Sequence, residues 1–314
     1  MIGIVGSGFG LYGYLPAVAL ASGEQILLME HYRNKFNSRP ELQIFENRIE
    51  WAKDLQEITA RAHTMILSVT PAQQSTIVRE NIIGSRVANL ILEKPVDVSP
   101  KSAAALLEKI LLSGINFRVG YNLVYTGWAR KLISLLGVDS HVENIEIDWS
   151  FMAHHYRTGT DTWKRNVTEG GGILRFYGIH FIALAALLGY NRILGSDITG
   201  FSDTDLYACH IVLQNGKGSR LSLHLDSHAA QNIFALSVFS GSTPDPVYTI
   251  TQKDPFTDSL PGAAGILDHR IDSLQAIFAS LFNASLNTEC REMYLQTNDL
   301  WKAVEKTASV TIKK

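Results

Sequence analysis

A short apolar run that ends in a cluster of glycines restricts the fold of this chain more than any other feature of its sequence. Ile2 to Val5 have the composition of a buried strand, and Gly6-Ser7-Gly8-Phe9-Gly10 follow directly. Glycines after a strand allow a tight turn and let the backbone approach a pyrophosphate at the start of a helix. The pattern predicts a nucleotide site. Leu11 replaces the third glycine of the G-x-G-x-x-G fingerprint, so a tight turn without a ligand is the alternative.

Apolar runs and stretches of helical composition alternate up to about residue 120. Further strands are expected at 25–29, 64–69, 88–92 and 116–119. A helix is expected at 99–112, where Ser99 is a suitable N-cap and Pro100 suits the first turn. This alternation predicts a doubly wound parallel sheet with right-handed helical crossovers.

The pattern changes beyond residue 144. Strands are expected at 144–151, 206–213, 219–226, 234–239 and 247–251, and helices at 177–188 and 268–281. These elements predict an open, mostly antiparallel sheet covered by helices. A length of 314 residues suits two domains. We therefore expect an α/β domain at 1–120, which binds a dinucleotide, and an α+β domain at 121–314, which binds substrate and forms oligomers.

Composition excludes several classes of protein. The 28 Lys and Arg against 30 Asp and Glu leave a net charge of −2 with no basic run, so nucleic acid is not an expected partner. The longest uninterrupted apolar run, at 181–188, is too short to span a membrane, and no signal peptide is expected. Two distant cysteines, Cys209 and Cys290, build no disulfide framework. The cytoplasm is the expected compartment, with a small molecule or a protein as partner.

The end of the second predicted strand bears on the choice of cofactor. Glu30 lies about 20 residues after Gly10, where an acidic side chain bonds the ribose 2′-hydroxyl of NAD. Arg33 could instead bind the 2′-phosphate of NADP. The sequence favours NAD over NADP, and two side chains of a solvated loop are the alternative.

Two further strand ends carry candidate ligand-binding residues. One strand leads into Ser68, Thr70 and Pro71, and the next leads into Glu93-Lys94-Pro95. Open α/β sheets bind their ligands at the carboxyl ends of their strands. Lys94 is therefore a candidate for proton transfer, although a lysine before a proline is also common in solvated turns.

These motifs, in their order and spacing, resemble the Gfo/Idh/MocA family, the glucose-fructose oxidoreductase and inositol dehydrogenase type. The resemblance covers essentially the whole chain. The motifs that carry it are Gly6 to Gly10, Leu15-Pro16-Ala17, Thr70-Pro71, Glu93-Lys94-Pro95, Gly120-Tyr121-Asn122, Gly170-Gly171-Gly172 and His180.

The resemblance implies a Rossmann domain and an NAD(P)-dependent oxidoreductase that moves a hydride between nicotinamide and a ring carbon of a sugar, nucleotide-sugar or cyclitol. It implies that Lys94 and His180 are catalytic and that the Lys94–Pro95 bond is cis. The expected cofactor-binding residues are Gly6, Gly8, Phe9, Gly10, Glu30, Arg33, Ser68, Thr70, Pro71, Glu93 and Asn122. A non-catalytic NAD(P)-binding regulator and an oxidoreductase for a non-sugar substrate are the alternatives.

One position departs from the family pattern. Phe176 stands where the family carries an aspartate, one helical turn before His180. The usual partner of the imidazole is therefore missing, and Tyr177 or Arg175 could take its place. A histidine satisfied within the helix is the alternative for His180.

A polar and aromatic stretch precedes the three glycines. This stretch is expected to bind substrate, because guanidinium groups form bidentate hydrogen bonds with phosphate and indole stacks on sugar rings. The expected substrate-binding residues are Arg157, Trp163, Arg165 and Tyr177. A solvated loop is the alternative reading of this stretch.

Polar residues alternate with leucines further along the chain. Ser222, His224, Asp226 and His228 share one face of the predicted sheet. We expect no metal there, because no distant ligand is evident, although a metal site is the alternative. The family resemblance implies that this face meets a second subunit, so a homo-oligomer is expected.

Overall fold

The computed structural model describes residues 1–138, 142–241, 244–256 and 267–313. Its contacts divide these residues into two compact units. The first unit contains 1–97, 102–122 and, from much later in the chain, 267–291. The second contains 98–101, the described part of 123–256, and 292–313. The sequence-based division after residue 120 does not include the return of 267–291 to the first unit.

The first unit is built on a parallel six-stranded sheet. Its strands are β1 (Ile2–Val5), β2 (Ile26–Met29), β3 (Ile49–Ala52), β4 (Thr64–Leu67), β5 (Asn89–Leu92) and β6 (Asn116–Val119). They lie in the order β3-β2-β1-β4-β5-β6. This order reverses between β1 and β4, which is the switch point where doubly wound sheets bind nucleotides. The predicted sheet is confirmed, and β3 is an additional edge strand whose residues are mostly half-buried.

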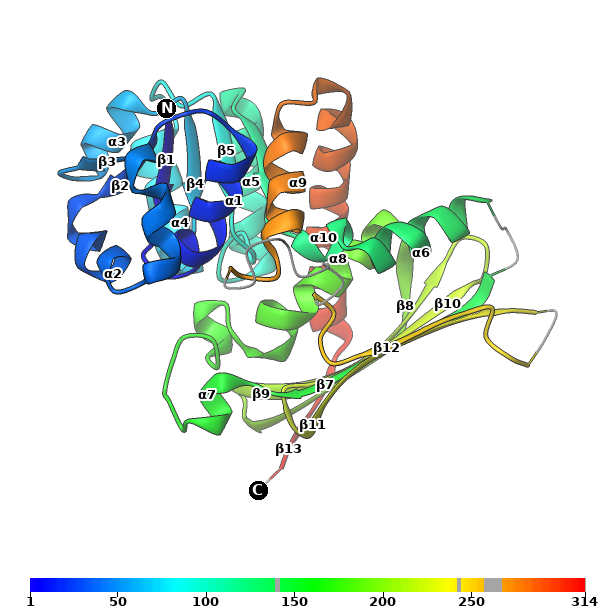
Figure 1. Ribbon diagram of the computed structural model, residues 1–314. Helices are drawn as coiled ribbons and strands as arrows, with labels where there is room; N and C mark the ends of the chain where they lie inside the picture. The colour runs from blue at the N-terminus through cyan, green and yellow to red at the C-terminus, as the bar shows by residue number, and fades with distance from the viewer. Residues whose placement is uncertain (139–141, 242–243, 257–266, 314) are drawn as a thin grey trace. The chain divides into compact units, whose positions relative to one another are not determined.

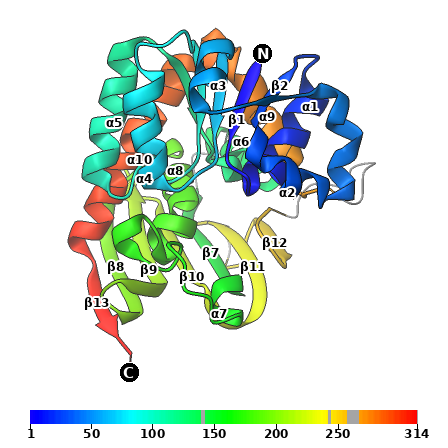
Figure 2. The ribbon, with the colours of Figure 1, turned by 90° about the vertical axis from the view of Figure 1, so that its left-hand side faces the viewer.

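Helices lie on both sides of this sheet (Figures 1 and 2). They are η1 (Gly10–Tyr14), α1 (Leu15–Ala21), η2 (Glu30–Tyr32), α2 (Arg33–Asn37), η3 (Pro40–Arg48), α3 (Leu55–Arg61), α4 (Pro71–Ile77), η4 (Val78–Ile82), α5 (Pro100–Ser113) and, from the returning segment, α9 (Ile271–Leu281) and η8 (Ala284–Leu286). Helix α9 packs on α1 and β6. A segment near the end of the chain thus completes the unit that the N-terminal residues build.

The second unit contains a mixed seven-stranded sheet. Its strands are β7 (Val142–Met152), β8 (Tyr190–Ser202), β9 (Asp205–Asn215), β10 (Arg220–Asp226), β11 (His228–Ser240), β12 (Tyr248–Gln252) and β13 (Ser309–Ile312). Figure 2 shows them from right to left in the order β12-β11-β7-β10-β9-β8-β13. Only the pairs β7–β10 and β8–β13 are parallel within the described residues. The mostly antiparallel sheet that the sequence predicted is confirmed.

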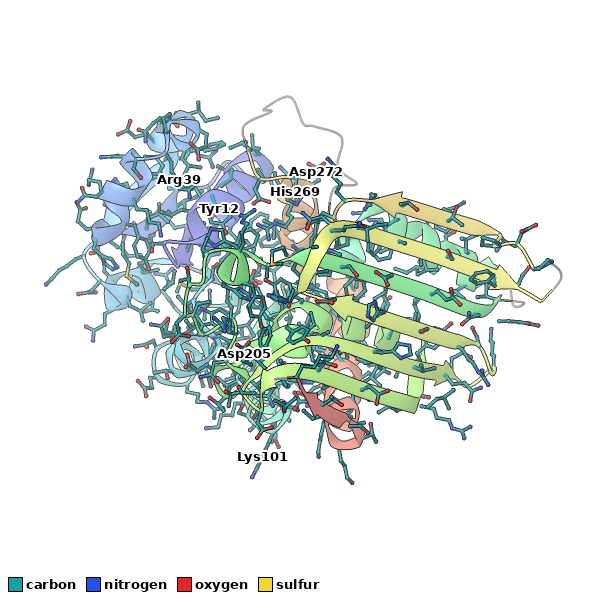
Figure 3. The ribbon with its side chains drawn as sticks, turned by 90° about the horizontal axis from the view of Figure 1, so that it is seen from below. Tyr12, Arg39, Lys101, Asp205, His269 and Asp272 are labelled. Atoms are coloured by element: carbon teal, nitrogen blue, oxygen red, sulfur yellow. The ribbon has the colours of Figure 1, made fainter. Side chains whose placement is uncertain are left out.

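Helices cover one face of this sheet (Figure 1). The second unit's helical segments are η5 (Asn122–Tyr125), α6 (Gly127–Val138), α7 (His154–Arg157), η6 (Val167–Glu169), η7 (Ile173–Gly178), α8 (Ile179–Leu187) and most of α10 (Asn287–Thr307). Figure 3 looks onto the opposite face, which α6, α8 and α10 leave open. The helical stretch Val167–Leu187 is long and apolar enough to cross a membrane by length and composition alone, but 78% of its most apolar part is buried within the protein. It is a core helix of this unit.

Candidate functional site

The turn after β1 can be made only with glycine at its first position. Gly6 has φ +133°, and a Cβ there would lie 2.0 Å from the carbonyl oxygen of Ser68. The Gly6 N–H donates to the Tyr32 hydroxyl at 3.1 Å. A Cβ on Gly10 would lie 3.3 Å from the Ile4 side chain. These two glycines let the ends of β1 and β4 approach each other.

Gly8 stands apart from them. A Cβ on Gly8 would meet no atom within 4 Å, so its backbone faces open space. Phe9 directly precedes η1, and no side chain caps the start of that helix. The Leu11 N–H donates to the Gly8 carbonyl at 2.9 Å, so the backbone closes the first helical turn without a side-chain cap. A glycine turn with open backbone ahead of a helix is the arrangement that pyrophosphates occupy. The turn therefore fits a dinucleotide.

Asn122, which follows β6 at the end of the first unit's second segment, is a further candidate for contact with a ligand. The side chain is buried, and its Oδ1 has no hydrogen-bond partner among the described residues. Buried polar atoms are rarely left without a partner in native proteins, so a missing ligand is a natural explanation.

Glu30 and Arg33 bond each other. Arg33 Nε and Nη2 donate to the two carboxylate oxygens of Glu30 at 2.7 and 2.9 Å, and this lowers the pKa of Glu30. The guanidinium also lies 4.6 Å from the centre of the Trp51 ring. The two residues that the sequence assigned to competing cofactors therefore form one exposed ion pair at the end of β2.

The residues that follow β4 form the start of helix α4. Ser68 N–H donates to the Val5 carbonyl at 2.7 Å, which extends the sheet by one residue. Thr70 caps α4 in a reciprocal arrangement with Gln73, and Pro71 occupies the first turn. These predicted residues thus hold the start of α4 beside the glycine turn.

Glu93 connects the end of β5 to the glycine turn. Its carboxylate accepts hydrogen bonds from the Tyr14 hydroxyl at 2.8 Å and from Lys94 N–H at 3.3 Å. Burial raises the pKa of the Glu93 carboxyl, while the charges of Lys94 and Arg270 oppose that rise. Lys94 is half-buried, and its bond to Pro95 is cis, as the family resemblance implied.

Arg270 is a residue of this region that sequence reasoning missed. Its guanidinium stacks 4.1 Å from the centre of the Phe9 ring and is held by Asp268 through two hydrogen bonds of 2.8 Å. The segment has no motif that would reveal it, because its position depends on the return of α9 to the first unit. Arg270 brings a positive charge to the glycine turn and to Glu93.

In the second unit the three glycines hold a loop in place. A Cβ on Gly171 would lie 2.1 Å from the Trp163 carbonyl oxygen. Gly171 N–H donates to Asn166 at 2.9 Å, and Gly172 N–H donates to Lys164 at 2.8 Å. Only glycine permits this contact between the Trp163 loop and the start of the helix that carries His180.

His180 lies on α8 and is buried. Its ring meets the Phe256 ring edge-on at 5.5 Å. Tyr177, one turn earlier, packs against Phe151 at 4.8 Å, and burial raises the pKa of its hydroxyl. Phe176 packs edge-on against Trp163 at 5.3 Å. Apolar packing thus replaces the carboxylate that the family pattern places at this position.

The basic candidates differ in how they are held. Arg157 is exposed on α7. Arg165 is paired with Asp205, which also accepts a hydrogen bond from Tyr156 at 2.6 Å (Asp205 is labelled in Figure 3). Arg175 is bonded to both carboxylate oxygens of Glu305, at 2.6 and 2.9 Å. Arg165 and Arg175 therefore already have anionic partners within the second unit.

His155 lies beside this polar group. The side chain is buried, and burial, together with the charges of Lys164 and Arg165, lowers its pKa to about 4. The imidazole is therefore neutral near pH 7.

The open face of the large sheet carries the polar row that the sequence predicted. Ser222, His224 and Asp226 alternate with buried leucines on β10, and His228 begins β11. His224 Nδ1 lies 2.7 Å from an Asp148 carboxylate oxygen. In the part of the chain that the structure describes, no group of three histidine, cysteine or acidic side chains is placed to hold a metal.

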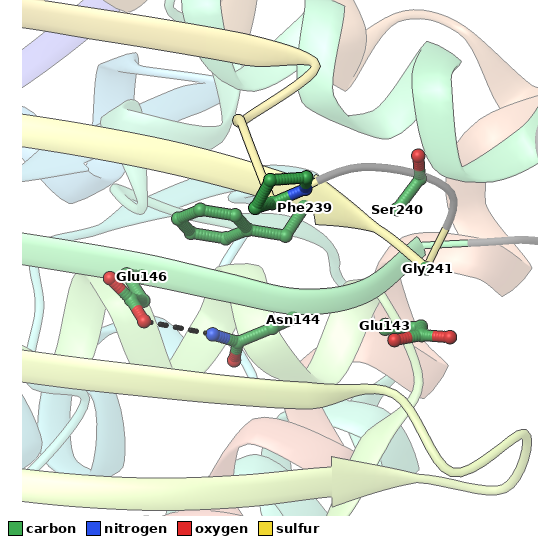
Figure 4. Close-up of a pocket in the computed structure, with 7 residues that line it drawn as sticks. Glu143, Asn144, Glu146, Phe239, Ser240 and Gly241 are labelled. Atoms are coloured by element: carbon green, nitrogen blue, oxygen red, sulfur yellow. Dashed lines mark hydrogen bonds between the residues drawn. The ribbon is translucent and has the colours of Figure 1, made fainter.

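A pocket of about 450 Å³ lies at one end of β7 and β11. Figure 4 shows Glu143, Asn144, Glu146 and Phe239 among its lining residues, with Asn144 donating to Glu146 at 2.9 Å. None of the residues singled out from the sequence lines it.

The strand order and the glycine turn define the first unit as a dinucleotide-binding fold. Three solved structures share the whole two-unit architecture. KijD10, a 3-ketoreductase from Actinomadura kijaniata in complex with NADP and TDP-benzene, has a TM-score of 0.72 and 14% identity, over 100% of this chain and 99% of its own. A myo-inositol dehydrogenase from Corynebacterium glutamicum has a TM-score of 0.70 and 15% identity, over 98% and 96%.

GenD2 from gentamicin A biosynthesis, in complex with NAD, has a TM-score of 0.69 and 16% identity, over 98% of this chain and 93% of its own. No protein-family model matches the sequence, and a comparison with curated proteins finds no relative. At these identities the likenesses confirm the fold that the sequence resemblance implied.

Proposed function

We propose that the chain is an NAD(P)-dependent oxidoreductase that acts on a ring carbon of a sugar, nucleotide-sugar or cyclitol. The observation that carries the proposal is the glycine turn, where Gly8 faces open space directly ahead of a helix that no side chain caps. The similar structures support it, because KijD10 is a 3-ketoreductase in complex with NADP and TDP-benzene and another is a myo-inositol dehydrogenase.

The first unit would hold the cofactor. Gly6, Gly8 and Gly10 would surround the pyrophosphate, and Ser68, Thr70 and Pro71 would contact the cofactor from the end of β4. The buried Oδ1 of Asn122 would accept a hydrogen bond from the cofactor. When bound, the nicotinamide supplies or accepts the hydride.

Lys94 would move the proton of the reacting hydroxyl. It follows Glu93 at the end of β5, where the Tyr14 hydroxyl and the Lys94 N–H both donate to the Glu93 side chain and hold it beside the lysine. His180 would orient the substrate rather than carry its proton, because Phe176 replaces the acidic partner of the imidazole.

The choice between NAD and NADP depends on the Glu30–Arg33 pair. An intact pair presents no net charge to a 2′-phosphate, so we propose a modest preference for NAD. Calorimetry with both nucleotides tests this. Arg33→Ala should free the Glu30 carboxylate and increase the preference for NAD, whereas equal affinities for that variant would remove Glu30 from cofactor recognition.

The second unit would bind the substrate. Trp163 and Tyr177 offer aromatic faces for a sugar ring, and the exposed Arg157 offers a charge for an attached phosphate. Arg165 is a weaker candidate for phosphate because Asp205 neutralises it. It would instead hold the loop that carries Trp163.

A non-catalytic NAD(P)-binding regulator is the second candidate. Phe176 favours it, because apolar packing occupies the position of an acidic side chain beside His180. The regulator would keep the glycine turn but would not need Lys94.

One set of experiments separates these candidates. Mass and ultraviolet absorbance identify any nucleotide that copurifies, and nicotinamide absorbance then reports turnover with sugars, cyclitols and nucleotide-sugars. Lys94→Ala should lower kcat by about 10²- to 10⁴-fold and leave nucleotide affinity unchanged. Tight nucleotide binding without turnover on any of these substrates would favour the regulator or a non-sugar substrate.

We also propose a cytoplasmic homo-oligomer whose contact is the open face of the large sheet. Support comes from the row of polar side chains on β10 and from Ile233 on β11, which is exposed and alternates with the buried Phe234 and Leu236.

A further inference from the structure

Gln74, on α4, bonds the backbone of the segment that carries Lys94. The Gln74 side chain is fully buried. Its Oε1 accepts the Glu93 N–H at 2.8 Å, and its Nε2 donates to the carbonyl oxygens of Glu93 at 2.9 Å and Val96 at 3.0 Å. Nε2 also donates to the Pro95 carbonyl oxygen at 3.5 Å, so one amide bonds four backbone groups between Glu93 and Val96.

The turn needs such a partner. β5 ends at Leu92, so its hydrogen-bonded ladder does not include Glu93 or Val96. Pro95 has no N–H to donate. Buried backbone groups without partners are strongly disfavoured, and a primary amide offers the donor and acceptor pattern of a neighbouring strand.

The helix that carries Gln74 is itself fixed. Thr70 caps its start in a reciprocal bond with Gln73, and Pro71 occupies its first turn. The position of the Gln74 amide is therefore set by the end of β4, and the amide transmits that position to the end of β5.

We propose that Gln74 is a positioning residue for Lys94: it fixes the backbone from Glu93 to Val96 and thereby the point from which the lysine side chain extends. The placement of Lys94 stands on the contacts above, and only the effect on turnover rests on the proposed function. Misplacing a catalytic group by about 1 Å can cost about 100-fold in rate, so a rigid turn matters to a proton carrier.

Two substitutions test the proposal. Gln74→Met keeps the length of the side chain and removes all four hydrogen bonds. Gln74→Glu keeps an acceptor for the Glu93 N–H but sets a carboxylate against three carbonyl oxygens, a conflict that protonation relieves. Gln56→Glu, at an exposed position on α3, is the matched control.

The measurement is the rate of reductive methylation of Lys94 relative to the exposed Lys101, read by peptide mass spectrometry on protein shown by circular dichroism to be folded. We expect the ratio to change at least about 3-fold in Gln74→Met. In Gln74→Glu the methylation ratio should differ from that of the parent at pH 8 and approach the parent's ratio at pH 6. Gln56→Glu should match the parent at both pH values.

Ratios within about 1.5-fold of the parent in folded Gln74→Met would overturn the proposal. If Gln74→Met does not fold, Gln74→Glu decides, and a ratio that matches the parent at both pH values overturns it. Where the parent shows turnover, kcat should fall about 10- to 100-fold in Gln74→Met with nucleotide affinity within 2-fold. Unchanged kcat together with a changed ratio would overturn the role of Lys94 in the proposed function and support its positioning by Gln74. An inactive parent with a changed ratio would overturn the proposed function and support the positioning of Lys94.

Discussion

At the scale of single residues, the glycines of the first turn do different work although they are neighbours in the sequence. Gly6 is required by the protein itself, because a Cβ would collide with the Ser68 carbonyl at 2.0 Å. Gly8 is not required by any protein atom, because its Cβ would meet open space. A side chain at position 8 is therefore expected to clash only with a bound ligand.

Substituting these glycines separates folding from nucleotide binding. Gly8→Val should unfold near the parent's urea midpoint and lose nucleotide affinity at least about 100-fold, because the side chain fills the space of the pyrophosphate. Gly6→Ala should lower the urea midpoint itself. Gly23→Val, at an exposed site where a Cβ also meets open space, is the control. Undiminished NAD(H) binding by Gly8→Val would place the cofactor elsewhere.

His155 gives the stability of the protein a specific pH dependence. Its pKa is about 4 in the folded protein against an ordinary value of 6.5, so the unfolded chain binds the proton more strongly. Stability should therefore fall as the pH decreases from about 6.5 to about 4, by about 2 to 3 kcal/mol from this residue. The contribution is complete above pH 6.5.

His155→Phe cannot bind that proton in either state. Its stability relative to the parent should therefore increase by about 2 to 3 kcal/mol between pH 7 and pH 4, measured by urea unfolding with fluorescence detection. The adjacent His154 is exposed, so His154→Phe should follow the parent across the range. Identical pH profiles for His155→Phe and the parent would contradict the burial of a neutral imidazole.

Sequence reasoning placed Gly6, Gly8 and Lys94 after strand ends, and the structure has them there, because an apolar run directly precedes each motif. Their roles in binding and catalysis stay predictions. Arg270 and the pairing of Arg165 with Asp205 could not be predicted, because they depend on contacts between segments far apart in the chain. Hydrophobic periodicity predicts which face of a helix or strand is buried, but it does not predict which side chain from a distant segment contacts that face.

At the scale of elements, α9 shows how a late segment completes an early sheet. Arg118 on β6 is almost fully buried. Its guanidinium donates to the Phe117 carbonyl at 2.9 Å, to Ser280 Oγ at 3.1 Å and to Asn287 Oδ1 at 2.8 Å, and it also bonds the Ser280 carbonyl. This one side chain links β6 to the end of α9 and the start of α10.

Arg118→Met should therefore destabilise the protein by roughly 2 to 4 kcal/mol, because it leaves buried carbonyl oxygens without donors. Amide hydrogen exchange in α9 should increase more than exchange in β1 or β4. Arg130→Met, at an exposed position on α6, should change neither quantity. Uniform destabilisation without selective exchange in α9 would contradict a local link.

The elements that the sequence missed share a physical cause. β8 contains Gly195 and Gly200, and its pairing with β9 shifts register near both, so no regular alternation marks it as a strand. β3 and β13 are short edge strands of mostly half-buried or exposed residues. Strands were predicted well where a continuous apolar run or strict alternation reflects a buried face, as in β1, β5 and β10.

At the scale of the whole molecule, the open face of the large sheet is the surface that we propose as the contact between subunits. Polar side chains occupy much of it, including the His224–Asp148 pair. Ile233, 37% exposed, and Phe201, 42% exposed, add apolar area to the same sheet. A stable interface of standard size buries about 800 Å² on each partner.

We therefore expect light scattering at micromolar concentration to give a mass of two or four times 34.7 kDa. Ile233→Asp should shift the mass toward the monomer, because it places a charge among residues that would be desolvated on association. Leu112→Asp is the control, because Leu112 is 81% exposed on α5 and lies outside this sheet. A parent that is already monomeric, or an Ile233→Asp oligomer of unchanged mass and dissociation constant, would show that this face remains open to solvent.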